Sequence, residues 1–401
     1  HHAAYILGGF ALVSQLLALV RDRLLASTIG PGAILDAYFA AFRIPDLMYA
    51  LLASLMSVSV LIPFLTEREG NSAEEKSFMN SVFSSFFIVI IIASAILWFF
   101  VPWLVESFIK DEGINSTLVI SLTRIMLLQP IFLGISNLLA SITQSRRRFF
   151  LYALSPLVYN LSIIFGIAFF APTYGIVGVT WGVVIGAVLH FLIQIPFVSS
   201  ENMLPRFTHA INWPLIKKIV LISFPRTLAI SATMLELVFM TFYASKMMPG
   251  SLSLFNLSFN LQSVPLAIVG VSYSLAAFPT LSKLFSQGAR DEFVEHIIVP
   301  AKHIIFWSLP ITALFIVLRA HIVRVILGSG NFNWEDTRLT AAALALFVIS
   351  LVGQNLELLF TRGYYAAGNT KKPLIVNLFS SILVVIFGYA FIMIFKSFPY
   401  V

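Results

Sequence analysis

The sequence lacks cysteine and contains little charge. Without a thiol there is no disulfide framework, no cysteine nucleophile and no cysteine-ligated metal. Charged residues make up 11% of the 401 residues, whereas soluble domains contain about 25%. The sequence also lacks a His-Glu-x-x-His pair, a phosphate-binding G-x-x-x-x-G-K-[ST] loop and a G-x-S-x-G turn. These absences argue against an enzyme and against an ATP-driven pump.

Long apolar runs take the place of the missing charge. Hydrophobic residues account for 59% of the chain, and its mean hydropathy is +0.94. So much apolar surface cannot be buried around one aqueous core, so part of it must face lipid. We therefore predict an all-α polytopic membrane protein with about eleven transmembrane helices, at 3–28, 33–66, 78–105, 115–144, 150–171, 174–199, 213–246, 251–284, 293–318, 336–366 and 372–397.

The basic residues are distributed unevenly between the predicted loops. Fourteen Lys and Arg fall after the even-numbered spans and five after spans 3, 5, 7 and 9. Because basic loops stay in the cytoplasm, this asymmetry predicts a cytoplasmic N-terminus. The formal net charge of +7 is interpreted in the same way, and no nucleic acid partner is predicted.

An internal repeat divides the sequence. Pro31-Gly32 and Pro249-Gly250 precede equivalent spans 218 positions apart, and Asn137-Leu138 and Asn355-Leu356 match at the same spacing. The alternative is coincidence between apolar helices. We predict an N-terminal lobe at 1–200 with six spans and a C-terminal lobe at 201–401 with five, the sixth span of this repeat being absent. Parallel repeats of this kind occur in transporters, with the substrate between the lobes.

Ionisable residues inside the first two spans form the main candidate site. Arg21 and Asp22 lie in the first span, and Asp36 and Arg43 lie seven residues apart in the second. A charge within the membrane is costly unless it is paired or hydrated. These residues either line a hydrated cavity that holds an anionic group, with the aspartates orienting the arginines, or pin the two helices together.

Other polar residues fall within later spans. Asn256 and Asn260, with Ser263, form one polar stripe on the eighth span. Arg226 follows Pro225 and either lines the cavity or extends to the interface. Three further residues have a structural and a functional alternative each: Arg124 as an interfacial residue or a cavity cation, His190 as a packing residue or a proton relay, and Glu236 as a hydrogen-bonding residue or a coupling carboxylate.

Three segments carry a family resemblance. The run Ser14–Asp22, the run Asp36–Leu47 (D-A-Y-F-A-A-F-R-I-P-D-L) and the run Tyr364–Pro373 (Y-Y-A-A-G-N-T-K-K-P) resemble signatures of the MurJ (MviN) lipid II flippases. That family lies within the multidrug/oligosaccharidyl-lipid/polysaccharide exporter (MOP) superfamily. The resemblance spans the whole chain, although Gln15, Tyr49 and Asn260 stand where the family usually has arginine.

The resemblance implies both a fold and a cargo. The fold is two parallel-repeat helical bundles around a central V-shaped cavity, and family members usually add two further helices. The cargo is the undecaprenyl-pyrophosphate-linked peptidoglycan precursor lipid II, moved by alternating access from the cytoplasmic to the outer leaflet of the bacterial inner membrane. Guanidinium groups suit its pyrophosphate because they bind oxygens in a bidentate fork and stay charged.

The sequence thus predicts a lipid II flippase that is not an enzyme and acts as a monomer. Its predicted substrate-binding residues are Arg21, Asp22, Asp36, Arg43, Arg226, Asn256 and Asn260. No cofactor or metal site is predicted, and Glu236 and Asn377 are the candidates for sodium or proton coupling. The alternatives are another exporter of the superfamily, either a lipid-linked oligosaccharide flippase or a drug/cation antiporter, and a non-transporting membrane scaffold. A membrane glycosyltransferase is disfavoured because no sizeable outer loop carries a catalytic acid.

Overall fold

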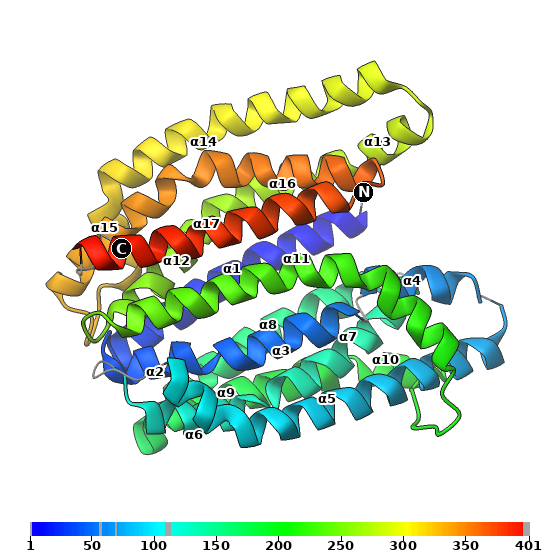
Figure 1. The fold of residues 1–401 in the computed structure, drawn as a ribbon, viewed down its shortest axis with the longest axis horizontal. Coiled ribbons are helices and arrows are strands. Elements are labelled where there is room, and N and C mark those ends of the chain that lie inside the picture. The colour runs from blue at the N-terminus through cyan, green and yellow to red at the C-terminus, as the bar shows by residue number, and fades with distance from the viewer. Residues whose placement is uncertain (1, 56–57, 69, 109–113, 147, 396–401) are drawn as a thin grey trace. The chain divides into compact units, whose positions relative to one another are not determined.

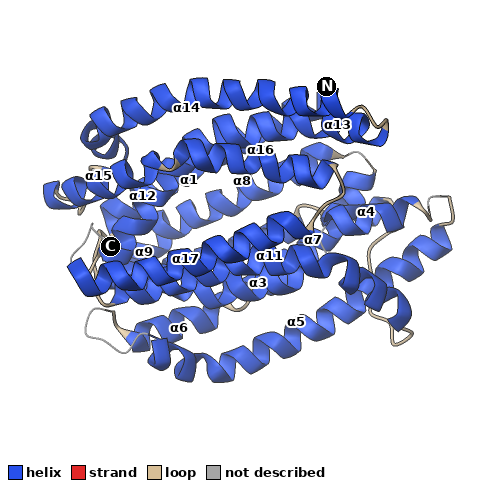
Figure 2. Cartoon of the chain, turned by 45° about the horizontal axis from the view of Figure 1, so that its top comes forward, coloured by secondary structure: helices blue, strands red, loops and turns tan. Residues whose placement is uncertain are grey.

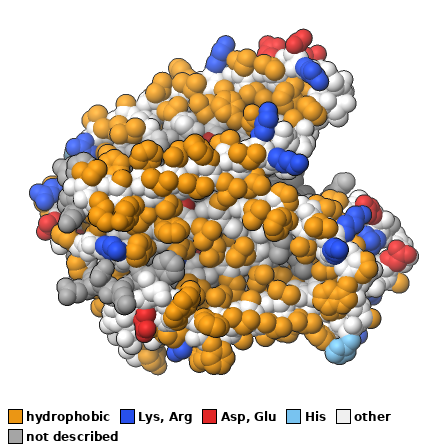
Figure 3. All heavy atoms as spheres, viewed as in Figure 1, with side chains coloured by type: hydrophobic (Ala, Val, Ile, Leu, Met, Phe, Trp, Pro, Cys, Tyr) orange, Lys and Arg blue, Asp and Glu red, His pale blue; other side chains and the backbone are white. Residues whose placement is uncertain are grey.

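The described part of the chain is entirely helical. The computed structural model describes residues 2–55, 58–68, 70–108, 114–146 and 148–395, and every regular element in these ranges is a helix (Figures 1 and 2). Hydrophobic side chains cover the lengths of the helices on the face that Figure 3 shows, and charged side chains gather towards helix ends. The predicted all-α membrane fold is confirmed.

The helices follow the predicted spans, and several spans are broken. The elements are α1 His2–Thr28, α2 Ala33–Ala41, α3 Arg43–Leu55, α4 Val58–Thr66, α5 Ser72–Phe108, α6 Ser116–Met126, α7 Gln129–Ser145, α8 Phe149–Phe165, η1 Gly166–Phe170, α9 Ala171–Leu192, α10 Ile195–Ser200, α11 Trp213–Ser245, α12 Ser251–Leu266, η2 Ala267–Val271, α13 Ser272–Ser286, α14 Arg290–Leu327, α15 Trp334–Ile349, α16 Leu351–Ala366 and α17 Lys371–Phe395. The elements η1 and η2 are single π-helical turns.

The predicted helix at 33–66 is not continuous. It consists of α2, α3 and α4, with a turn at Phe42 between the first two. Pro45 explains this break because it has no N–H to donate to the carbonyl of Ala41. Asp36 and Arg43 therefore lie on two successive helices rather than within one continuous span.

Fewer helices than predicted meet the length and composition that a membrane span needs. Among the described residues, seven helical stretches are long and apolar enough to cross a membrane, or eight if α15 and α16, bent by 45°, form one span. One of the seven, Phe150–Ser200, has 51 residues. It contains α8 and α9, which pack side by side, and a non-helical backbone at Gly175 (φ 57°) marks the reversal. The predicted count of eleven is thus not confirmed.

The helix boundaries repeat in the register that the sequence indicated. The start of α5 at Ser72 recurs 218 positions later as the start of α14 at Arg290. The start of α6 at Ser116 recurs at the same spacing as the start of α15 at Trp334. Because side-chain chemistry differs between these helices, the shared boundaries are a finding separate from the sequence motifs.

The contacts divide the chain into two compact units. Unit 1 contains His1–Leu24 and Ala33–Lys246, and unit 2 contains Leu25–Gly32 and Met247–Val401. Helix α11 belongs to unit 1, where it packs along α3. The predicted boundary between an N-terminal lobe at 1–200 and a C-terminal lobe at 201–401 refers to the sequence repeat. It stays a prediction.

Unit 2 includes the last turn of α1 and the short segment that follows it. The Asn331 backbone N–H donates to the carbonyl oxygen of Ser27 at 2.9 Å, and its side chain donates to that of Thr28 at 2.8 Å. Further along, Val269, Ile304 and Leu359 form a buried core between η2, α14 and α16. Asn355 donates to the hydroxyl of Ser308 at 2.8 Å beside this core.

Candidate substrate-binding site

Arg21 and Asp22 form the central ion pair of the candidate site in unit 1. Both Nε and Nη2 of Arg21 donate to the same oxygen, Oδ1 of Asp22, at 2.9 and 2.8 Å. The Asp22 side chain is 2% exposed, whereas that of Arg21 is 21% exposed. The carboxylate is thus buried, and it orients a guanidinium that remains partly accessible.

A second helix holds the other arm of the guanidinium. Nη1 of Arg21 donates to Oδ1 of Asn160 in α8 at 3.2 Å. The amide of Asn160 is fixed in turn, because its Nδ2 donates to the Pro156 carbonyl at 3.1 Å and to the Ser14 hydroxyl at 3.3 Å. Sequence reasoning missed Asn160, and its only signal was an amide within an apolar span.

Two tyrosines lie near this pair, and Asp36 is buried on the helix that carries one of them. Tyr38 in α2 and Tyr159 in α8 lie close enough to interact electrostatically with Arg21. Tyr38 is 2% exposed and Asp36 is 1% exposed. Asp36 lies in the first turn of α2, where the positive end of the helix dipole stabilises a carboxylate. The buried phenols and carboxylates keep this part of unit 1 polar inside an apolar bundle.

Arg43 has a different environment. Its Nε donates to the hydroxyl of Thr241 in α11 at 2.8 Å. It also lines a cavity of about 430 Å³ whose other walls are apolar side chains of α2, α3, α5, α6 and α11, except for the two threonines Thr123 and Thr241. The structure therefore places Arg43 at an apolar cavity rather than in the Arg21–Asp22 pair.

Asp46 is an acidic residue that sequence reasoning overlooked. It interacts electrostatically with Arg43, and also with Tyr38 and Tyr159, which links the surroundings of both arginines. Its spacing of three residues from Arg43 on one helix was the available signal. At one position where the family usually has arginine, Tyr49 accepts a 2.6 Å hydrogen bond from Nδ2 of Asn137.

The remaining candidates are distributed over both units. In unit 2, Asn256 donates to the carbonyl of Leu252 within α12 at 2.7 Å, and Asn260 is half-buried on the same helix. Asn377 is half-buried in α17 of unit 2, and Glu236 in α11 of unit 1. The side chain of Arg226 lies outside the described part of the structure. In the described part, no group of three or more His, Asp or Glu could hold a metal ion.

His190 belongs to a structural network. Its Nδ1 lies 2.7 Å from the hydroxyl of Ser136, which also donates to the His190 carbonyl at 2.9 Å. Gln194 donates to the same hydroxyl at 2.5 Å. These contacts join α7 to α9 and agree with the interpretation of His190 as a packing residue.

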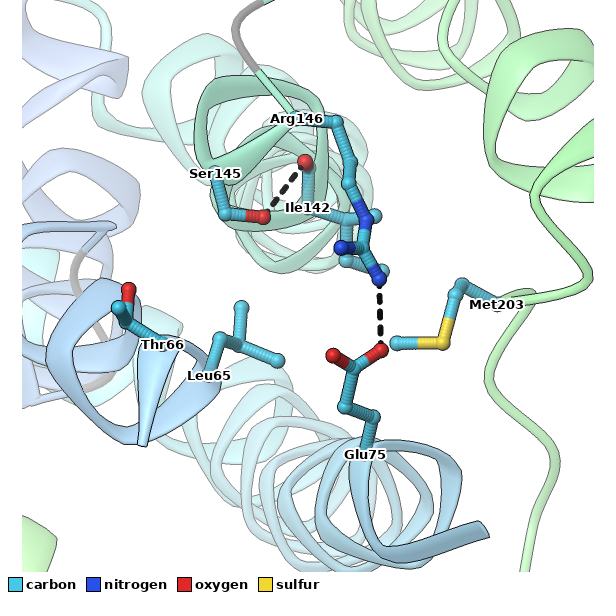
Figure 4. A pocket seen from close by; sticks show the side chains of 7 residues that line it. All are labelled: Leu65, Thr66, Glu75, Ile142, Ser145, Arg146 and Met203. Atoms are coloured by element: carbon cyan, nitrogen blue, oxygen red, sulfur yellow. Dashed lines mark hydrogen bonds and ion pairs between the residues drawn. The ribbon is translucent and has the colours of Figure 1, made fainter. Parts of the chain in front are cut away.

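A second buried ion pair lies at the other end of the unit 1 helices. Arg146 at the end of α7 donates through Nη2 to Oε2 of Glu75 at 2.7 Å (Figure 4). The side chain of Glu75 is 4% exposed and that of Arg146 is 30% exposed. Figure 4 shows the pair beside a small pocket that Leu65 and Met203 also line. We interpret it as a tie between α5 and α7.

The fold and the charges buried in its spans define a multi-pass membrane transporter. A solved multidrug resistance MATE transporter of the MOP superfamily, in its inward-facing conformation, matches with a TM-score of 0.79 at 16% identity, over 96% of this chain and 88% of that chain. At this identity the likeness shows the fold.

The chain belongs to the MurJ family. The family model described as "Lipid II flippase MurJ" matches residues 25–399. The protein named "Lipid II flippase MurJ" of Burkholderia cenocepacia is 27% identical, over 97% of this chain and 78% of that protein. A solved structure of MurJ in an inward closed conformation matches with a TM-score of 0.84 at 26% identity, over 97% of this chain and 82% of that chain. The predicted family is confirmed, and the chain is a multi-pass bacterial membrane protein of a flippase family.

Proposed function

We propose that this chain translocates lipid II from the cytoplasmic to the outer leaflet of the bacterial inner membrane by alternating access. The observation that carries this proposal to particular residues is the geometry of Arg21. Its guanidinium is held by Asp22 and Asn160, and the Arg21 side chain is nevertheless 21% exposed. A fixed guanidinium with an accessible edge suits a pyrophosphate, because it presents parallel N–H donors to two oxygens.

The roles of the other residues follow from their surroundings. Asp22 keeps the Arg21 fork oriented when no anion is bound and competes with phosphate for it, which permits release. Arg43 supplies a second positive charge next to apolar walls, which suits the junction between a pyrophosphate and a hydrocarbon chain. Asp36 stays a substrate-site candidate because it is a buried carboxylate on α2, the helix that also carries Tyr38.

Several finer points belong to the same proposal. Arg226, Asn256 and Asn260 are further substrate contacts, and Glu236 and Asn377 are the candidates for a coupling cation. The protein works as a monomer with a cytoplasmic N-terminus, without nucleic acid and without catalysing a chemical reaction. Its energy comes from an ion gradient or the membrane potential, since the sequence has no nucleotide-binding loop.

Transport of fluorescent lipid II in proteoliposomes tests the proposal. The decisive variant combines Arg21→Gln with Asp22→Asn, because it removes the site charge without leaving either partner buried and unpaired. If the pair only joins helices, the neutral double variant transports normally. We expect at least a tenfold loss of transport. Arg319→Gln is the control, because Arg319 is exposed on α14 and donates only to the carbonyl of Ile316.

Binding by native mass spectrometry separates the remaining alternatives. Lipid II is compared with a lipid of equal chain length and neutral headgroup. Equal binding of both lipids, together with normal transport by the double variant, overturns the proposal and favours another exporter activity or a scaffold. If selective binding is lost in the double variant and kept in Arg319→Gln, the pyrophosphate is assigned to the site of Arg21.

A further inference from the structure

Arg124 in α6 has no acidic partner among the residues that the structure describes. Its Nε donates to the backbone carbonyl of Trp98 in α5 at 3.3 Å, and its guanidinium lies 4.3 Å from the centre of the Trp98 ring. No hydrogen bond or ion pair involves its Nη1 or Nη2 in the part of the chain that the structure describes. Arg21 and Arg146, in contrast, each contact a carboxylate.

The depth of Arg124 suits a lipid headgroup. It lies eight residues after Ser116, which opens α6, so it is about 12 Å along the helix from that end. Trp98 lies ten residues before Phe108, the last residue of α5, at about the same depth. Headgroup regions occupy roughly 5–7 Å on each side of the hydrocarbon. Arg124 therefore lies roughly 5 Å deeper than this layer when the start of α6 is at its outer surface. An arginine side chain spans such a distance by extending its charge towards the headgroups, and Trp is enriched near the same interface.

An open groove lies beside this guanidinium, and Arg124 is one of the residues that line it. It has a volume of about 450 Å³, and Arg124 is its only charged lining residue. Its walls come from α5, α6, α7 and α9, all in unit 1, and include Ile91, Leu128 and Trp181. The one hydroxyl in the lining, that of Ser94, already faces Met48 Sδ at 3.7 Å. Apolar walls of this kind favour contact with hydrocarbon over contact with water.

We propose that this groove binds one anionic phospholipid of the surrounding bilayer. Its phosphate accepts hydrogen bonds from Nη1 and Nη2 of Arg124, and one acyl chain lies in the groove between Ile91 and Leu128. Charge complementarity selects an anionic headgroup, because the groove presents a single positive charge. The stacking of Arg124 on Trp98 keeps the guanidinium from leaving this position. The site is separate from Arg21 and does not depend on the transported cargo.

Native mass spectrometry of the full chain released from detergent tests this site. The probes are phosphatidylglycerol and phosphatidylcholine with identical acyl chains. We expect one phosphatidylglycerol to bind more tightly than the rest and Arg124→Gln to weaken that binding about tenfold. Arg338→Gln is the matched control, because Arg338 is an exposed arginine near the start of α15 and lines neither the groove nor the apolar cavity beside Arg43.

A second variant keeps the charge of Arg124 and blocks the groove that the acyl chain of the lipid would occupy. Ala95 is exposed on α5 and lines the groove, so Ala95→Trp occupies the groove while Arg124 itself is unchanged. We expect the same loss of the tight phosphatidylglycerol. Unchanged phosphatidylglycerol binding in Ala95→Trp would mean diffuse attraction to a surface charge and overturns the proposal. Equal loss in Arg124→Gln and Arg338→Gln overturns it as well. If Arg124→Gln does not fold, Ala95→Trp decides.

Discussion

The Nε of Arg43 donates a 2.8 Å hydrogen bond to the hydroxyl oxygen of Thr241, 198 residues further along the chain. The Thr241 hydroxyl in turn donates a hydrogen bond to the backbone carbonyl of Leu237 at 2.9 Å. Arg43 opens α3 and Thr241 lies in α11, so this bond ties the two helices that pack along each other in unit 1. It also fixes the guanidinium at the wall of the apolar cavity.

Thr241→Val removes this acceptor while keeping the shape of the side chain. Hydrogen bonds to charged groups contribute about 1.5–3 kcal/mol, so we expect unfolding to become easier by about 2 kcal/mol. The melting temperature in detergent, followed by circular dichroism, measures the effect. Thr180→Val is the control, because the buried Thr180 hydroxyl bonds only the Ile176 carbonyl of its own helix. Equal losses in both variants would contradict a special role for the Arg43 contact.

The sequence predicted the helical class, the repeat and the charged residues because hydropathy and spacing are local properties. The register of 218 residues found in the motifs also governs the starts of α5 and α14. Arg21 and Asp22 are neighbours in the chain, so their pairing could be anticipated. The orientation of the guanidinium could not, since it depends on Asn160, 139 residues away.

Tertiary contacts explain what the sequence missed. Asp46 was quoted within a motif and not assigned to the site, because its interactions with Tyr159 in α8 are not visible in the sequence. The helix break at Phe42 was missed even though Pro45 is a known cause of such breaks. The interfacial role of Arg124 stays a prediction, and the groove beside it has no sequence signature because four helices form it.

Gly182→Ala should disrupt the hairpin of α8 and α9. A Cβ at this position would lie 2.9 Å from the Cα of Gly166, and backbone atoms cannot move aside as a flexible side chain can. Overpacking of this kind costs roughly 1–3 kcal/mol, which we expect as a lower melting temperature. Gly353→Ala in α16 is the control, because nothing lies within 4 Å of its added Cβ. There the higher helix propensity of alanine, about 1 kcal/mol, should stabilise the protein instead. Effects of the same sign would refute this account.

Asn333 and Asp336 form a reciprocal cap at the start of α15. Oδ1 of Asn333 accepts from the Asp336 backbone N–H, and Oδ2 of Asp336 accepts from the Asn333 backbone N–H, both at 2.9 Å. Replacement of a cap by alanine typically costs about 1 kcal/mol. Because each side chain holds the backbone of the other residue, the two losses should not add in Asn333→Ala with Asp336→Ala. A double-mutant cycle on melting temperature measures this coupling, and strictly additive shifts would disprove it.

The pair of Glu75 and Arg146 stabilises the end of unit 1 that Figure 4 shows. Glu75→Gln leaves a guanidinium without its buried carboxylate, and breaking a buried pair costs about 3–5 kcal/mol. We expect a smaller loss, about 2 kcal/mol, because the Arg146 side chain is 30% exposed and lies 3.8 Å from a second carboxylate, that of Glu201. Glu74→Gln is the matched control, since Glu74 is exposed and its carboxylate only accepts from Asn71.

The neutral combination of Glu75→Gln with Arg146→Met distinguishes a buried pair from a surface one. If burial of an unpaired charge causes the loss, the double variant should melt at a higher temperature than Glu75→Gln alone, because neither charge remains. The difference between Glu75→Gln and the parent should also persist between 0.05 and 0.5 M salt, roughly a threefold change in screening length, since buried pairs are screened little. A difference that disappears at the higher salt concentration would place the pair in solvent and contradict its role as a tie between α5 and α7.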